Sequence, residues 1–429
     1  MSARPLRVLF VDPVREGSGE IITTLHMGRA LRREGAEVHY LGTPLARRLL
    51  GEEFAGAVQP LGDDPEANFR RWTAALSELR PHAVVFADLP FFWLRHGTVQ
   101  LRSPAALLDA IESLDVPVFS LDHMGMAQGP ITLYFGPPHL AQAPHRIPAL
   151  PERVGRLLPC PMHEPGEVEG RKGAPFRYWE VPIVRPPGER EQVRASVLRK
   201  PGERLVFYPI PGWAVRVGEA IGHPYHRLLP EFFEYYFGGL GAPVTIVVVN
   251  GQAIPARAPG DVRIVPMPIL DVDRFEALMF AADLLLTDNG ISIAMGKALC
   301  GLQACAHLRN RWRLAQLDAR LDGRIRELMW ATERAQLGSV YPYEVFPAGT
   351  RAEIEALGLF RDNTITEGFA SVELFGGEQT RAELRALLLD EERREQLALH
   401  QRAYVERLAA APSVDEVLRA AIAGRGAAA

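Results

Sequence analysis

Residues 284–293 read Leu-Leu-Leu-Thr-Asp-Asn-Gly-Ile-Ser-Ile, and this stretch decides the fold. Three branched apolar residues in a row are typical of the end of a buried parallel strand. Asn289 and Gly290 follow as a short turn, and the small apolar residues of Ile293–Leu299 indicate a helix. A strand that ends in a glycine turn and opens a helix directs free backbone N–H groups at one point, which attracts anions. The stretch predicts either a phosphate-binding turn or an ordinary strand–helix turn of an α/β domain.

The composition limits the class of protein. The chain has 429 residues, of which 47% are hydrophobic and 23% charged, and its net charge is -4. The length predicts about two domains. The lack of a basic excess argues against nucleic acid and against an anionic membrane surface. Cys160, Cys300 and Cys305 lack the paired spacing of zinc or thioredoxin motifs, and no apolar run approaches the ~20 residues of a membrane span, so we expect a cytoplasmic protein.

The first half of the chain alternates strands and helices. Apolar runs predict strands, and period-3.6 patterns predict helices, at Arg7–Val11, 20–33, Val38–Leu41, Ala67–Leu79, Ala83–Ala87, Pro104–Leu114 and Val116–Leu121. This alternation is typical of a doubly wound α/β fold. The turn Gly17-Ser18-Gly19 lacks the third glycine of the dinucleotide fingerprint, so we expect no nicotinamide or flavin cofactor.

Polar side chains follow several of these strands, where ligands of such sheets bind. Glu20 begins a helix, Asp88 follows one strand, and Asp122 and His123 follow another. A carboxylate beside a histidine can set its tautomer and pKa, so Asp122 and His123 are candidate catalytic residues. The alternatives are a capping role for Glu20, a cap or turn role for Asp88 and a surface loop for the pair.

The second half predicts a second sheet after an irregular, proline-rich linker at residues 130–201, in which Tyr178–Val184 is one candidate strand. The expected strands and helices are Arg204–Ile210, Tyr225–Phe237, Pro243–Asn250, Val262–Val265, Arg274–Ala282, Asp283–Thr287 and Gln303–Ala306. We therefore expect an N-terminal Rossmann-like domain with linker (residues 1–190), a C-terminal Rossmann-like domain (191–395) and C-terminal helices (396–429) that pack back on the first domain.

Several segments resemble the GT-B superfamily of glycosyltransferases, in particular the UDP-glycosyltransferases and MurG. Residues 278–292 read LMFAADLLLTDNGIS and are similar to the donor-phosphate loop "AADLVLTHGGIS" of that family. Weaker similarities are the glycine loop at Gly17–Glu20, the Gly-Ala-Glu-Val at 35–38, the helix end at 298–301 and the C-terminal stretches 381–408 and 411–417. The resemblance implies two Rossmann-like doubly wound domains that face each other across a cleft.

The resemblance also implies a chemistry. A nucleotide-sugar would bind mainly to the second domain, where the backbone of Gly290, Ile291 and Ser292 would hold the leaving diphosphate. The helix N-terminus replaces a metal ion, so neither a metal nor a cofactor is expected. A small-molecule acceptor would lie near the glycine loop, with Glu20 as the base that takes its proton.

Other positions depart from the family pattern or extend the donor site. Asp288 and Glu20 stand where the family has histidines, Lys297 replaces the ribose-binding glutamate, and Glu378 with Gln379 is a loose counterpart of the sugar-recognition pair. Lys297 would bind a phosphate or pair with Asp288 or Asp283. Two strand ends on the donor side carry further candidate residues: Trp213 with Tyr208 at one, and the Asn250-Gly251 turn at the other. An aromatic ring at such a position can stack on a base or sugar.

Three functions remain open at this point. The first is metal-independent sugar transfer from a nucleotide-sugar to a small molecule. The second is hydrolysis or epimerisation of a nucleotide-sugar, or use of a sugar-phosphate donor. The third is a catalytically silent binding protein or partner subunit, which an exposed apolar patch along Phe91–Leu94 would favour. The sequence leaves open whether the chain forms a homodimer.

Overall fold

The computed structural model describes most of the chain. The described residues are 5–15, 18–93, 98–128, 130–133, 145–166, 168, 172–220, 224–252, 254–256, 260–289, 292–310, 323–333 and 363–426. Gly17, Gly290 and Ile291 of the predicted site, and Leu94 of the predicted apolar patch, lie outside these residues.

The first sheet forms the N-terminal unit and has seven parallel strands in the order β3-β2-β1-β4-β5-β8-β9. They are β1 (Arg7–Asp12), β2 (Glu37–Gly42), β3 (Val58–Pro60), β4 (Ala83–Phe86), β5 (Val118–Leu121), β8 (Val154–Cys160) and β9 (Ala174–Arg177). Strands β6 (Ile131–Leu133) and β7 (His145–Ile147) pair separately as a small antiparallel sheet. The order reverses between β1 and β4, which is the point where doubly wound sheets open a crevice.

The second sheet forms the C-terminal unit, with six strands in the order β12-β11-β10-β13-β14-β15. Its strands are β10 (Arg204–Pro209), β11 (Val244–Val249), β12 (Val262–Met267), β13 (Leu284–Thr287), β14 (Cys305–Arg309) and β15 (Ala370–Glu373). Every residue of β11 and β13 is buried, as expected for parallel strands that are covered by helices on both faces. The order of this sheet reverses between β10 and β13.

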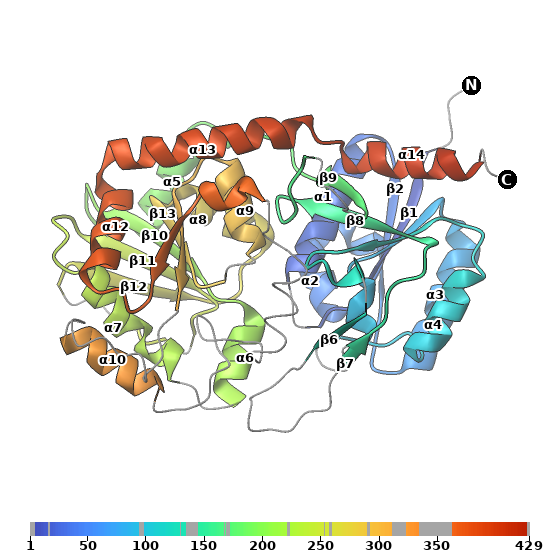
Figure 1. Cartoon of the computed structure of the whole chain (residues 1–429), viewed down its shortest axis with the longest axis horizontal. Coiled ribbons are helices and arrows are strands. Elements are labelled where there is room, and N and C mark those ends of the chain that lie inside the picture. Colours follow the sequence, from blue (N-terminus) through green and yellow to red (C-terminus); the bar gives the residue numbers. More distant parts are fainter. Residues whose placement is uncertain are drawn as a thin grey trace.

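Helices cover both sheets and join the two units. They are α1 (Gly19–Arg33), α2 (Pro44–Phe54), α3 (Pro65–Leu79), α4 (Pro104–Glu112), α5 (Glu189–Val197), α6 (Gly212–Ala220), α7 (Tyr225–Phe237), α8 (Val272–Ala281), α9 (Ile293–Cys300), α10 (Gly323–Glu333), α12 (Glu378–Leu389), α13 (Glu391–Ala410) and α14 (Val414–Gly426). Figure 1 shows α13 running along the C-terminal unit and α14 crossing onto the N-terminal unit. There α14 contacts α1 and β9.

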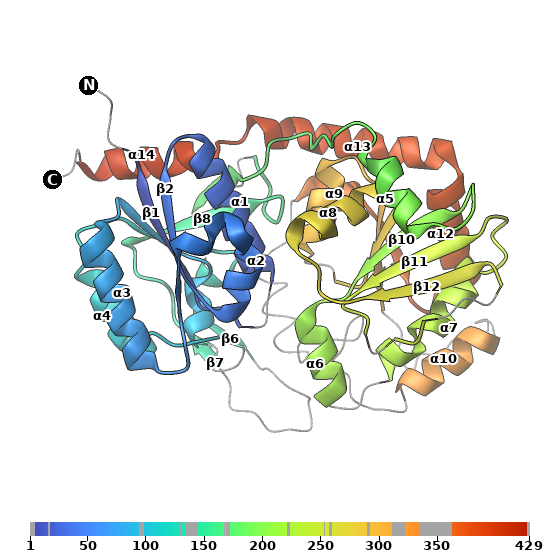
Figure 2. The ribbon, with the colours of Figure 1, turned by 180° about the vertical axis from the view of Figure 1, so that it is seen from behind.

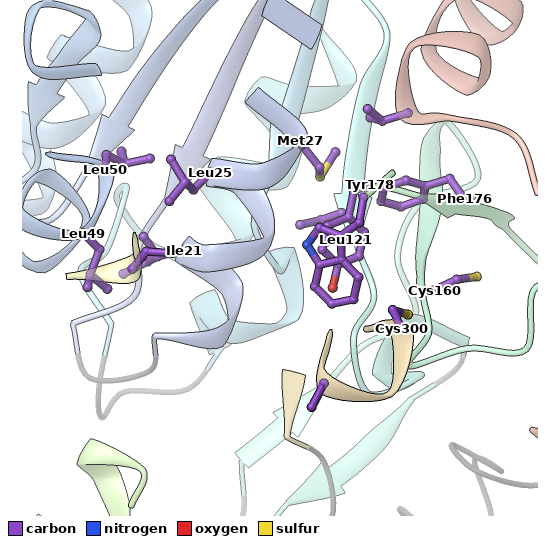
Figure 3. Packing of buried hydrophobic residues seen from close by; sticks show 14 of the residues in the cluster. Ile21, Leu25, Met27, Leu49, Leu50, Leu121, Cys160, Phe176, Tyr178 and Cys300 are labelled. Atoms are coloured by element: carbon purple, nitrogen blue, oxygen red, sulfur yellow. The ribbon is translucent and has the colours of Figure 1, made fainter. Parts of the chain in front are cut away.

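The two units share one hydrophobic core where they meet. Phe176 and Tyr178 of the N-terminal unit belong to the same buried cluster as Cys300 at the end of α9, as Figure 3 shows. A Cβ atom on Gly296 of α9 would lie only 2.6 Å from Pro161 Cγ, so the backbone of α9 packs directly on the loop after β8. This close approach requires glycine at position 296.

The structure confirms the two doubly wound sheets and corrects parts of the irregular region. Tyr178–Val184 was predicted as a strand, but no strand forms there; the nearby strand β9 ends at Arg177. The proline-rich stretch instead supplies β8, β9 and α5. The proposed division at residues 190 and 395 stays a prediction.

Candidate functional site

A cleft of about 500 Å³ lies between the two units, and strands of both sheets point their carboxyl ends toward it. Its lining includes residues one or two positions after the ends of β5, β8, β10, β11 and β13, namely His123, Met162, Ile210, Asn250 and Asn289. Helices α1, α2, α6, α8 and α9 provide the remaining walls, and Figure 2 shows α2 on the side that faces the C-terminal unit. Such a crevice at strand ends is where doubly wound proteins bind their ligands.

Two helices begin at the same point of this cleft. Gly19 opens α1 and Ile293 opens α9, and a Cβ atom on Gly19 would lie 3.0 Å from Ile293 Cδ1. Ser292 caps α9, because its side chain accepts a hydrogen bond from the N–H of Met295 at 3.4 Å. Ser18, Gly19 and Ser292 all line the cleft. Each helix N-terminus carries partial positive charge, so the two together favour a bound anion at this point.

Glu20 and His123 provide titratable groups on the N-terminal side of the cleft. His123 is 4% exposed, and its Nε2 lies 3.0 Å from Thr23 Oγ1. The Thr23 hydroxyl donates to the carbonyl of Gly19 at 3.0 Å, so it accepts the hydrogen bond from Nε2. Neutral His123 therefore carries its proton on Nε2. Burial also lowers the pKa of His123.

Three buried carboxyl groups lie beneath this surface. Burial raises the pKa of Asp12 to about 7 and that of Asp122 to about 6. Burial, with the nearby charge of Asp122, raises the pKa of Asp88 well above its usual range. Asp88 Oδ2 lies 3.8 Å from His123 Nδ1, which carries no proton in the neutral tautomer. A protonated Asp88 fits this arrangement, because an ionised carboxylate would face a bare lone pair.

Asp288 is buried rather than placed against a ligand. It is 1% exposed, and its Oδ2 accepts a hydrogen bond from Tyr208 at 2.8 Å. The Tyr208 hydroxyl also contacts the hydroxyl of Tyr225 at 3.0 Å. Burial raises the pKa of Asp288 to about 6. The sequence suggested that Asp288 would face a diphosphate, but this carboxyl group does not line the cleft, so direct contact with a ligand there is impossible without rearrangement.

Lys297 pairs with a residue that the sequence did not indicate. Its ammonium donates to Glu276 of α8 and lies 3.0 Å from His26 Nε2 of α1. Burial lowers the pKa of Lys297 to about 8 and that of His26 to about 4. Burial alone would raise the pKa of Glu276, but contact with His26 and the charge of Lys297 bring it down to about 2. At pH 7 the network is thus an ion pair beside a neutral histidine.

The structure brings together about half of the predicted site. The cleft is lined by Ser18, Gly19, Glu20, His123, Trp213, Asn250, Asn289, Ser292 and Lys297. Asp122, Gly251 and Asp288 are buried and do not line it. Glu378 and Gln379 begin α12, where both are exposed and lie outside the cleft lining.

The predicted aromatic patch also lies elsewhere. Phe92 is buried and stacks edge-on against Phe86 with ring centroids 5.8 Å apart. Phe91 and Trp93 are half-buried and do not line the cleft. These three residues therefore pack within the N-terminal unit.

The described residues provide neither a cluster of metal ligands nor a membrane-spanning helix. No group of three or more His, Cys, Asp or Glu side chains there is placed to hold a metal ion. Within the same ranges, no helix combines the length and apolar character needed to cross a membrane.

Known structures share this architecture. The spinosyn forosaminyltransferase SpnP matches 97% of this chain and 99% of its own at 14% identity, with a TM-score of 0.54. A putative UDP-N-acetylglucosamine 2-epimerase from Listeria monocytogenes matches 92% of this chain and 91% of its own at 12% identity, with a TM-score of 0.50. CalG4, the calicheamicin glycosyltransferase, covers 99% and 100% at 16% identity, with a TM-score of 0.49. Two parallel sheets facing across a cleft, with this chain order, define the GT-B fold.

The chain belongs to the family of unknown function DUF6365, which matches residues 27–426. No curated protein sequence matches it. The similarities to SpnP and to the putative epimerase, at 14% and 12% identity, therefore establish the fold alone, and the activity has to be argued from the site itself.

Proposed function

We propose that the protein is a glycosyltransferase that moves a sugar from a nucleotide-sugar to a small-molecule acceptor without a metal ion. One observation carries the proposal: the N-termini of α1 and α9 meet at Gly19 and Ile293 inside a cleft that also holds Glu20. The positive ends of two helices next to a carboxylate suit a reaction in which a diphosphate leaves while a hydroxyl group loses its proton.

In this reaction the bond between the anomeric carbon and the diphosphate oxygen breaks, and the acceptor oxygen bonds to that carbon. The diphosphate takes the electron pair and is stabilised by the helix N-termini at Ser292 and Gly19. Glu20 takes the proton of the acceptor hydroxyl. His123 is less suited to this task, because its Nε2 already donates to Thr23 and its Nδ1 faces Asp88.

The Lys297 network favours a nucleotide-sugar over a sugar-phosphate donor. A lone ammonium would attract the phosphate of a simple sugar phosphate, but Lys297 is neutralised by Glu276. Trp213 and Asn250 line the cleft on the C-terminal side and provide an aromatic face and an amide for the nucleotide.

Epimerisation or hydrolysis of a nucleotide-sugar is the second candidate. Asp12, Asp88 and Asp122 add three buried carboxyl groups to Glu20, whereas a single deprotonation requires only one base. A putative epimerase also shares the fold. This reaction would convert the donor when no acceptor is present.

The test begins with a thermal-shift panel of UDP, TDP, GDP, ADP and CDP and their common sugar conjugates, with EDTA present. A ligand at about 100 times its Kd stabilises the folded state by about 2.7 kcal/mol, so binding raises the melting temperature. The donor so identified is then incubated with and without a mixture of small-molecule alcohols and phenols, and products are resolved by mass spectrometry. A glycosylated acceptor is expected; isomerised or hydrolysed donor in its place would establish the second candidate, and no stabilisation by any nucleotide would refute both.

Glu20→Gln tests the assigned base in the same assay. We expect turnover to fall by about 10²–10⁴-fold because the proton acceptor is lost, while nucleoside diphosphate affinity is unchanged. Glu52→Gln, an exposed position on α2 outside the cleft lining, is the matched control. Unchanged turnover in the Glu20 variant would remove this residue from the mechanism.

A further inference from the structure

One part of the cleft is apolar on both sides. Leu45 and Leu49 of α2 line it from the N-terminal unit, because positions four apart lie on one face of a helix. Ile269, Leu270 and Phe275, from the end of β12 to the middle of α8, line it from the C-terminal unit. This part of the cleft, which we call the apolar limb, is lined by apolar side chains and suits a ligand with an apolar body.

Ile269 supports a ligand at the apolar limb. Its side chain is 46% exposed, and of the three large hydrophobic residues that are this exposed among the described positions, it alone lines the cleft. An exposed isoleucine in a concave site gains free energy when an apolar group covers it, at about 25 cal/mol per Å² of buried surface. Isolated exposed apolar residues on a convex surface need no such explanation.

Arg48 adds a charge to this limb. It lies on the same face of α2 as Leu45, lines the cleft and is exposed. Within the described residues Arg48 forms no hydrogen bond or ion pair, whereas the cleft residues Arg15 and Lys297 pair with carboxylates. A guanidinium that none of the described residues neutralises is available to bind a carboxylate or phosphate in two-point geometry.

We propose that the acceptor is an apolar molecule that carries an oxyanion, either a carboxylate or a phosphate. Its apolar body lies between α2 and the segment from Ile269 to Phe275, and its anionic group binds Arg48. The proposal rests on the glycosyltransferase function and specifies the acceptor of the same site. A free sugar or other neutral polyol would leave Arg48 unpaired and would place hydroxyl groups against Leu45, Leu49 and Ile269.

Binding of matched probes tests this proposal without any donor. The probes are 4-phenylbutyrate, 4-phenylbutyl phosphate and 4-phenylbutanol, which share one apolar body and differ in the terminal group. Isothermal titration calorimetry gives each Kd. We expect both anions to bind more tightly than the alcohol, and Arg48→Gln to weaken the anions by roughly three- to tenfold while it leaves the alcohol unchanged.

The neighbouring residue provides the control. Arg47 is also exposed on α2 but does not line the cleft, so Arg47→Gln makes the same change in net charge without touching the limb. Ile269→Ser should weaken all three probes alike. Equal binding of the alcohol and the anions, or equal effects of the Arg47 and Arg48 variants, would overturn the proposal.

The relative affinities of the two anionic probes distinguish a carboxylate from a phosphate acceptor. Failure of this experiment and failure of the proposed function are separable. A protein that binds nucleotides and glycosylates neutral alcohols, with no contribution from Arg48, would keep the function and reject the acceptor class. A protein that binds the anionic probes through Arg48 but is not stabilised by any nucleotide would keep the anion-binding limb and reject the proposed function.

Discussion

Glu276→Gln tests the charged network that joins the two units. Glu276 lies on α8 and is 6% exposed. Its Oε1 accepts the hydrogen bond of Lys297 and lies 3.2 Å from His26 Nε2, and its Oε2 lies 3.8 Å from Arg185 Nη1. The amide keeps the shape of the side chain but removes its charge, so the ammonium of Lys297 remains buried without a counterion.

The expected loss follows from breaking a buried ion pair. Folding lowers the pKa of Glu276 from 4.5 to about 2, so the ionised carboxylate stabilises the folded state. This contribution is fully present above pH 4.5 and is lost as pH falls through about 2. Removing one partner of a buried pair typically costs about 3–5 kcal/mol.

Urea denaturation at pH 7 measures this loss. We expect the free energy of unfolding to fall by about 3 kcal/mol in Glu276→Gln and to recover most of that loss in the double variant Glu276→Gln/Lys297→Met, which has no orphaned charge. Glu327→Gln is the control, because its side chain is 71% exposed and pairs only with Arg324 of the same helix in the described structure. A Glu276 variant as stable as the wild type would refute the reasoning, as would a double variant whose loss equals the sum of the single losses.

Three further predictions concern other positions. Gly19→Val places methyl groups against Ile293, where a Cβ atom already lies 3.0 Å from Cδ1, so we expect weaker nucleoside diphosphate binding by calorimetry with an unchanged circular dichroism spectrum. Tyr208→Phe removes the hydroxyl that donates to Asp288 and should cost about 1–3 kcal/mol in urea denaturation; an unchanged free energy of unfolding would show that this hydrogen bond does not stabilise the fold. Burial raises the pKa of Asp12 from 3.8 to about 7, so its contribution favours folding at low pH and is lost as pH rises through 7. Between pH 5 and pH 8 the free energy of unfolding of the wild type should therefore fall by about 3 kcal/mol relative to that of Asp12→Asn. Parallel profiles of the free energy of unfolding against pH would contradict this.

The central strands could be predicted from the sequence because each one is marked by a continuous apolar run within its own few residues. Val244–Val249 and Leu284–Thr287 are continuous apolar runs, and only a strand covered on both faces uses such runs at this length. The strand and the helix on either side of residues 288–292 were predicted for the same reason. The resemblance to the GT-B glycosyltransferases rests on these short sequence segments, and the observed fold confirms it.

The strand β8 could not be predicted in the same way. Its sequence Val-Gly-Arg-Leu-Leu-Pro-Cys contains a glycine, an arginine and a proline, and it reads as a loop. Pairing with β5 on one side and β9 on the other makes it a strand, so tertiary contacts override its weak propensity. The helix α2 was also missed, and with it the apolar limb and Arg48.

The partner of Lys297 shows why the site itself was only partly predicted. The sequence offered Asp283 and Asp288, which are near in the chain, but Asp283 pairs with Arg190 and Arg194 while Asp288 is bonded to Tyr208. The actual partner, Glu276, lies 21 positions away, and His26 lies 271 positions away. A carboxylate within the apolar run Phe275–Phe280 was the available signal, because a buried charge requires a partner.

The site is thus a property of the contact between the units rather than of either one. The glycine loop and the donor turn are each weak signals, since many strand–helix turns expose backbone N–H groups. In the proposed function they form one anion site, because Gly19 lies close to Ile293 and Gly296 on the same helix packs on Pro161. Both contacts depend on a missing side chain at the boundary between units. The two glycines therefore set how closely the helix N-termini approach, and this approach is what the proposed function requires of a chain that departs from the glycosyltransferase sequence pattern at Glu20, Asp288 and Lys297.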